Sequence, residues 1–141
     1  GEAIREIVVT KTKAVLKKDF NPIRKNIVKF QEVTERERIE LIKKDRRYGK
    51  MVCRCEKVTE AEIVEAIHRP LGAKSIDGIK KRTRAGMGRC QSGFCMNRII
   101  EILSEELGIS IEEVTKFGGD SQILLGDIKE GFEGERRKEH V

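Results

Sequence analysis

All four cysteines of this chain lie in two short segments, and this arrangement constrains the fold more than any other feature. They form the pairs Cys53-x-Cys55 and Cys90-x4-Cys95, with 34 residues between the pairs. The first 18 residues are charged throughout and lack the apolar stretch of an export signal, so we expect a cytoplasmic chain with reduced thiols. Grouped cysteines in that setting favour metal binding over disulfide bonds. The sequence therefore predicts a four-cysteine metal site.

The composition indicates a small protein with a modest core. The chain has 141 residues, of which 38% are hydrophobic and another 38% charged, and it contains no Trp. Cores of this size are often completed by a bound metal or by a partner. No stretch approaches the roughly 20 apolar residues that a membrane-spanning helix needs. We therefore expect no transmembrane segment.

Capping boxes and apolar residues at helical spacing predict a mostly helical chain. The boxes begin at Thr34, Thr59 and Ser110, each followed three residues later by Glu. The predicted helices cover 3–17, 34–44, 59–69, 75–85, 96–107 and 110–117. Residues 50–56 are expected to form an extended loop or a short strand, and the charged segment 126–141 is expected to be disordered. The predicted fold class is all-α, with a small helical metal-binding domain preceded by a helical linker segment.

The spacing of the cysteines favours iron over zinc. In an extended Cys53-x-Cys55 segment the two side chains point the same way and can meet one metal, while Cys90-x4-Cys95 can loop around a second. A [2Fe–2S] cluster takes two thiolates on each iron, which two separated pairs supply. Structural zinc sites prefer a wider C-x2–4-C spacing, so zinc remains the alternative.

Glycines and arginines surround the predicted site in the sequence. Gly86, Gly88 and Gly93 are expected to free backbone N–H groups that point at sulfur. Arg54, Arg84 and Arg89 lie nearby and are expected to offset the negative charge of a thiolate-bound cluster.

Three stretches of the chain together carry a family resemblance: 48–56, 58–63 and 80–95, the last including Lys-Arg-Thr-Arg-Ala-Gly-Met-Gly. They resemble the bacterioferritin-associated-ferredoxin-like (BFD-like) [2Fe–2S] domain. The resemblance is greatest to the version at the C-terminus of FAD-dependent glycerol-3-phosphate dehydrogenases of the anaerobic type. It covers about residues 20–125.

The resemblance implies an all-helical cluster domain at 50–125, with Cys53, Cys55, Cys90 and Cys95 as ligands. In that family a separate flavin domain, which holds FAD, oxidises sn-glycerol 3-phosphate to dihydroxyacetone phosphate. Its electrons leave toward a redox partner or a membrane-associated acceptor, which implies a location peripheral to the inner face of the membrane. Residues 1–19 fit the last helix of a flavin domain of the same parent chain, and 20–49 fit a linker with one helix. Amino-acid and opine oxidases carry similar cluster domains and remain alternatives for the parent.

The net charge of the chain does not indicate a nucleic-acid partner. Residues 1–49 hold 14 Lys/Arg against 8 Asp/Glu, whereas residues 50–125 hold 12 against 11. The basic run 80–84, with Arg89, lacks interleaved aromatic residues, so we interpret it as a solvated surface that an acidic redox partner could also contact. No Ser/His/Asp or paired-carboxylate set stands out, and we expect this chain alone not to be a catalyst. Its predicted function is electron transfer, with a non-redox zinc- or cluster-stabilised docking domain as the alternative.

Overall fold

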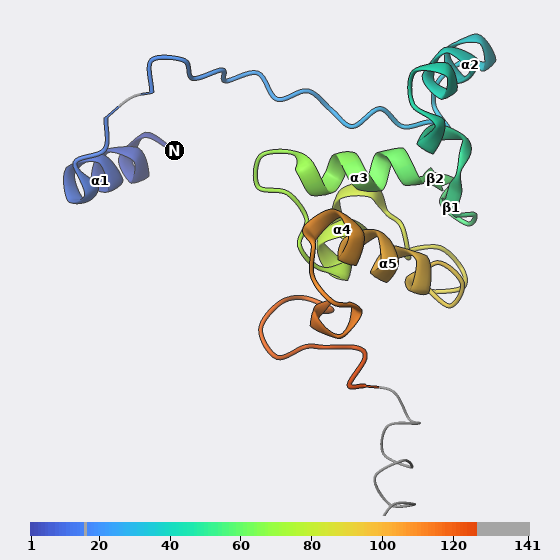
Figure 1. The fold of residues 1–141 in the computed structure, drawn as a ribbon. Helices are drawn as coiled ribbons and strands as arrows, with labels where there is room; N and C mark the ends of the chain where they lie inside the picture. Colours follow the sequence, from blue (N-terminus) through green and yellow to red (C-terminus); the bar gives the residue numbers. More distant parts are fainter. Residues whose placement is uncertain (16, 127–141) are drawn as a thin grey trace, which may run out of the picture.

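The structure, a computed structural model, describes residues 1–15 and 17–126. Helix α1 (Glu2–Thr12) has no buried residue, and Figure 1 shows it apart from the other helices at the end of a long extended stretch. Helix α2 (Glu35–Lys44) and the 3-10 turn η1 (Arg46–Gly49) follow that stretch and lead directly into the cysteine-bearing region.

The cysteine-bearing region consists of a short hairpin and three helices. Strand β1 (Met51–Cys53) pairs antiparallel with β2 (Val58–Thr59), with a bulge between the paired positions. Helices α3 (Glu60–His68), α4 (Ile76–Thr83) and α5 (Met96–Leu107) follow, and the 3-10 turn η2 (Ile111–Glu113) comes after them. Figure 1 shows α3, α4 and α5 gathered together, with the hairpin at one end of α3.

The core lies between α3, α4 and α5. Its fully buried members are aliphatic and come from all three helices: Ile63, Ile79, Ile99, Ile102 and Leu103. Val114, just beyond η2, is also buried and closes one side of the core. Cys53 and Cys95 belong to the same buried cluster. The predicted metal site therefore adjoins the core directly.

Local capping determines where several helices begin. The side chain of Thr34 accepts a hydrogen bond from the N–H of Glu37, whose carboxylate accepts one from the Thr34 N–H. Such reciprocal bonds satisfy donors that a helix start leaves unpaired. Ser75 caps α4 by accepting from the Gly78 N–H at 3.2 Å. The predictions of helix starts at Thr34, Thr59 and Ser75 are confirmed.

Three predictions about the fold need correction. The class all-α is too narrow, because β1 and β2 form a two-stranded sheet; the extended segment at 50–56 was expected, but its partner strand was not. The first helix ends at Thr12 instead of 17, where Lys13 turns left-handed with φ 50°. The last predicted helix, 110–117, is a single 3-10 turn. The tail expected to be disordered lies outside the described residues from 127 onward.

Candidate metal centre

The β1–β2 hairpin carries the first cysteine pair. Cys53 is the last residue of β1 and is 2% exposed, whereas Cys55 lies in the turn that follows and is exposed. Lys57 completes this turn with φ 52°, a left-handed conformation. Because the chain turns immediately after Cys53, the two side chains are not held on one face of an extended strand. One cysteine enters the core and the other stays at the surface.

The second cysteine pair lies on the loop that enters α5. Cys95 is the residue before the first turn of α5 and is 2% exposed, while Cys90 is partly exposed. The loop is built from successive tight turns, in which the N–H of Met87 donates to the Arg84 carbonyl and that of Gln91 to the Gly88 carbonyl. Both pairs therefore consist of one buried and one more exposed cysteine.

The four cysteines line one cavity of about 520 Å³, together with Met51, Val52, Arg54 and Phe94. Within it the Sγ atoms of Cys55 and Cys90 lie 3.7 Å apart. Two sulfur ligands at about 2.3 Å from one tetrahedral metal would lie about 3.8 Å apart, so this separation suits a shared metal ion.

The close sulfur pairs combine the two segments. The Sγ atoms of Cys55 and Cys90 lie 3.7 Å apart, and Cys53 is close enough to Cys95 to raise the pKa of its thiol. The sequence spacing predicts that each sequence pair shares one iron, and this assignment stays a prediction. Four cysteines around one cavity suit a group that contains two metal ions with two thiolates on each.

Two glycines allow close packing at the cysteine loop, one against the hairpin and one within the loop itself. A Cβ on Gly88 would lie 2.1 Å from the Cβ and 3.3 Å from the Sγ of Cys55, so the hairpin turn and the loop can touch only with glycine here. Gly86 has φ +86°, and a Cβ there would lie 2.3 Å from the Ser92 Oγ. From the sequence these glycines are expected to free N–H groups for sulfur; the structure adds close packing as a role of Gly86 and Gly88.

The environments of Cys90 and Cys95 shift their pKa values in opposite directions. The backbone N–H of Phe94, and then the thiol of Cys55, lower the pKa of Cys90. Burial, and then the neighbouring Cys53, raise the pKa of Cys95 to about 11. Metal ligation requires thiolates, and positive metal charge between the sulfurs would offset the cost of burying Cys95 in that form. The donor set and its surroundings therefore fit a thiolate-bound iron centre.

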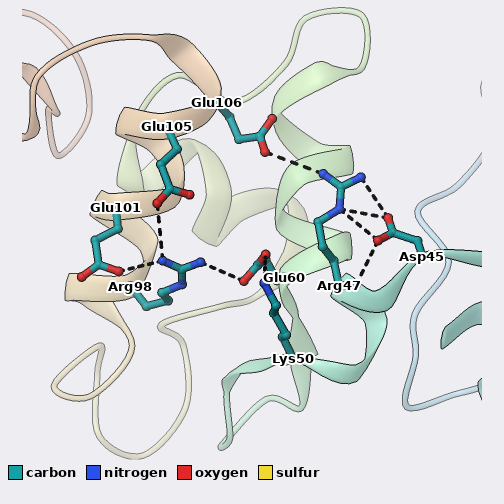
Figure 2. Close-up of polar contacts among 8 residues, drawn as sticks. All are labelled: Asp45, Arg47, Lys50, Glu60, Arg98, Glu101, Glu105 and Glu106. Carbon is teal, nitrogen blue, oxygen red and sulfur yellow. Dashed lines mark hydrogen bonds and ion pairs between the residues drawn. The ribbon is translucent and has the colours of Figure 1, made fainter.

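A buried carboxylate links the two cysteine-bearing segments. Figure 2 shows Glu60, at the start of α3, between Lys50 and Arg98, at 3.1 and 2.9 Å respectively. Lys50 precedes Cys53 by three residues, and Arg98 follows Cys95 by three. The Glu60 side chain is only 9% exposed. Glu60 therefore connects the start of β1, near Cys53, to α5, which follows Cys95.

The charge state of Glu60 reflects this position. Burial acts to raise the pKa of Glu60, but the hydrogen bonds from Arg98 and Lys50 outweigh it, so that the pKa is lowered. Glu60 was not predicted as a site residue, since in the sequence it is only the second residue of the capping box at Thr59. The local pattern gives no sign of partners that lie 10 and 38 residues away.

A second set of ion pairs joins the linker to α5. The guanidinium of Arg47 lies 2.9 Å from the Asp45 carboxylate and 3.7 Å from Glu106, and Figure 2 shows it reaching across from η1. Glu106 also pairs with His68, at the end of α3. The segment before the hairpin is thus fastened to the helices on either side of the site.

The arginines predicted near the site have different roles. Arg84 is bound to Glu56 at 2.7 Å and so ties the end of α4 to the hairpin turn. Within residues 1–15 and 17–126, Arg54 and Arg89 make no ion pair, and both are exposed. In the basic run, Arg82 donates to the carbonyls of Gly78 and Leu71, which is a structural role.

The fold and the four-cysteine cavity agree with a family match over the same segment. Residues 51–105 match the family model described as "BFD-like [2Fe-2S] binding domain". The matched segment includes both cysteine pairs, and it confirms the resemblance to BFD-like [2Fe–2S] domains noted from the sequence.

Curated relatives connect this domain to particular dehydrogenases. The chain is 56% identical over 113 residues to a glycerol 3-phosphate dehydrogenase of Caloramator mitchellensis, covering 80% of this chain and 24% of the relative. It is 34% identical over 76 residues to an anaerobic glycerol-3-phosphate dehydrogenase subunit from Escherichia coli K12, covering 51% and 14% respectively. An opine oxidase subunit from Rhizobium meliloti is 42% identical over 65 residues, covering 45% and 12%. The chain thus spans about a quarter or less of the length of these relatives.

No solved structure gives a significant match to the chain. None of the helices in the described residues is both long and apolar enough to cross a membrane.

Proposed function

We propose that this chain is the electron-transfer module of a flavin-dependent glycerol-3-phosphate dehydrogenase, with Cys53, Cys55, Cys90 and Cys95 holding a [2Fe–2S] cluster. The observation that carries the proposal is the set of four cysteines around one cavity, inside the segment that matches the family. Oxidation of glycerol 3-phosphate to dihydroxyacetone phosphate releases two electrons, whereas an iron–sulfur cluster accepts them one at a time.

The protein supplies three things to such a centre. The hairpin and the loop before α5 bring the sulfurs together, with Gly88 allowing the contact. The Phe94 N–H favours the thiolate of Cys90. Burial of Cys53 and Cys95 keeps water from one side of the site, while Cys55 leaves the other side open to a partner.

The proposed partners are a flavin domain that holds FAD and an acceptor beyond it. The division into a helix of the flavin domain at 1–19, a linker at 20–49 and a cluster domain at 50–125 stays a prediction, as does a cytoplasmic location peripheral to the membrane. The match to an opine oxidase subunit makes an opine oxidase the alternative parent enzyme. The longer match at higher identity to a glycerol 3-phosphate dehydrogenase favours that dehydrogenase as the parent.

The test is a visible absorption spectrum with metal and sulfide analysis on protein purified without oxygen. We expect bands between about 400 and 600 nm that bleach with dithionite, and close to two irons and two sulfides per chain. Replacement of Cys55 by Ser should greatly reduce the iron content. A colourless anaerobic preparation with one zinc per chain would contradict the proposal and favour the docking alternative. In the parent enzyme, glycerol 3-phosphate but not an opine should reduce the centre.

A further inference from the structure

An exposed aromatic side chain stands at the mouth of the cysteine cavity. Phe94 lies in the ligand loop between Cys90 and Cys95, lines the cavity and is 92% exposed. Met51, from the other segment, lines the same cavity and is 43% exposed. A phenyl group held almost fully in water contributes no burial energy to this domain, but burial by a partner would gain it. Aromatic side chains at such positions are typical anchors of protein interfaces.

Two arginines are direct sequence neighbours of cysteines that line the cavity. Arg54 lies between Cys53 and Cys55 and lines the cavity, and Arg89 immediately precedes Cys90. In the described part of the chain neither makes an ion pair, whereas the nearby Arg84 is neutralised by Glu56. We name Met51, Arg54, Arg89 and Phe94 the cluster face.

We propose that the cluster face is the docking surface for an acidic electron-transfer protein, with Phe94 as the apolar anchor and the two arginines as the basic rim. This inference rests on the proposed electron-transfer function and adds the chemistry of the partner. Carboxylates around an apolar area would complement the face in both charge and polarity, and opposite charges accelerate encounter. A lipid surface would also match basic and aromatic groups, but it contains no redox centre to exchange electrons with the adjacent cysteine site.

The probe is a flavodoxin, which is an acidic protein with one edge of its flavin exposed. Its hydroquinone, mixed in a stopped-flow instrument with the oxidised iron-loaded chain, gives up one electron to the cluster and becomes the semiquinone. For the wild-type chain we expect a rate that saturates with flavodoxin concentration and falls steeply as salt is raised. The double variant R54Q/R89Q should lower the second-order rate constant about tenfold at low salt. F94S should raise the apparent Kd about fivefold.

Matched variants separate the cluster face from general effects. R36Q/K74Q also removes two positive charges, but from exposed positions on α2 and before α4. F117S removes a phenyl group that is 69% exposed elsewhere. Neither control should change the rate constant or Kd more than about twofold. Every variant is first checked for iron content and for full bleaching by dithionite.

Distinct outcomes would overturn the two levels of inference. If the wild-type chain does not bleach, the proposed electron-transfer function fails. If it bleaches, but R54Q/R89Q behaves like R36Q/K74Q or F94S like F117S, the docking surface is wrong. A shift of the midpoint potential in R54Q/R89Q, with an unchanged flavodoxin rate constant, would assign the arginines to charge compensation at the cluster instead. Vesicles of phosphatidylglycerol that bind the wild-type chain but not these variants, without any saturable flavodoxin reaction, would replace the protein partner by a membrane.

Discussion

Replacement of Glu60 by Gln tests whether the buried carboxylate holds the cysteine segments together. The substitution keeps the size of the side chain but removes the charge that binds Lys50 at 3.1 Å and Arg98 at 2.9 Å. Hydrogen bonds to charged groups contribute about 1.5–3 kcal/mol each. The Lys50 and Arg98 side chains are 60% and 37% exposed, so water recovers part of the loss. We therefore expect E60Q to lower the free energy of unfolding by about 2 kcal/mol in total.

Glu101 offers a matched control for this experiment. It also binds Arg98, at 2.8 Å, but its side chain is 54% exposed. E101Q should therefore cost only about 0.3 kcal/mol. Thermal unfolding of the iron-loaded chain, followed by far-UV circular dichroism, should show a Tm lower by about 10 °C for E60Q and nearly unchanged for E101Q. During incubation with an iron chelator, the visible absorbance of E60Q should also decay faster, because Glu60 links the two cysteine-bearing segments and Glu101 does not.

The contribution of Glu60 should also depend on pH in one direction. Its pKa is lowered from 4.5 in the folded chain, so the carboxylate stabilises the fold above that value and loses its effect as pH falls through the folded pKa. The difference in Tm between wild type and E60Q should be constant from pH 7 to about 5 and shrink below about 4. Equal losses in E60Q and E101Q, or a difference that grows on acidification, would refute the role assigned to Glu60.

Two further predictions concern the cysteine cavity. Gly88→Ala should prevent iron incorporation, because its Cβ would lie 2.1 Å from the Cys55 Cβ. As a control, Gly49→Ala should retain full iron content by metal analysis, because its Cβ would meet only Ile42, at 3.8 Å. Equal iron in both variants would contradict the close packing at Gly88. In the metal-free chain at pH 7.5, iodoacetamide should modify Cys90 well before Cys95. The Phe94 N–H lowers the pKa of Cys90, and burial raises the pKa of Cys95 to about 11. Peptide mapping that finds Cys95 modified first would contradict these opposite pKa shifts.

The sequence predicted best those features that depend on residues close together along the chain. The helix starts at Thr34, Thr59 and Ser75 follow from side chains that bond to backbone N–H groups three residues away, and all three were correct. The four cysteines were identified from their spacing alone, and the cavity brings them together. The assignment of these four as cluster ligands stays a proposal that metal analysis must test.

Features that depend on contacts between residues far apart in the sequence could not be predicted from local patterns. The strand pairing of Met51–Cys53 with Val58–Thr59 turns the chain between Cys53 and Cys55, and the all-α class missed it. Beyond this turn, the Sγ of Cys55 lies 3.7 Å from that of Cys90, an approach of the two segments that the spacing did not predict. Glu60 is an ordinary residue of a helix start in the sequence, and its importance appears only where Lys50 and Arg98 converge on it.

The combination of one buried and one more exposed cysteine in each segment gives the site a direction. Cys53 and Cys95 are part of the core cluster with Ile99, so no partner can approach the sulfurs from that side. Cys55 and Cys90 lie at the surface side, where Phe94 also stands exposed. An electron that enters or leaves through protein contact must therefore pass on the side of Cys55 and Cys90. Gly88, which packs against Cys55, and the docking surface proposed around Phe94 thus belong to the same side of the domain. A substitution at either place should change electron exchange more than it changes the stability of the helical core.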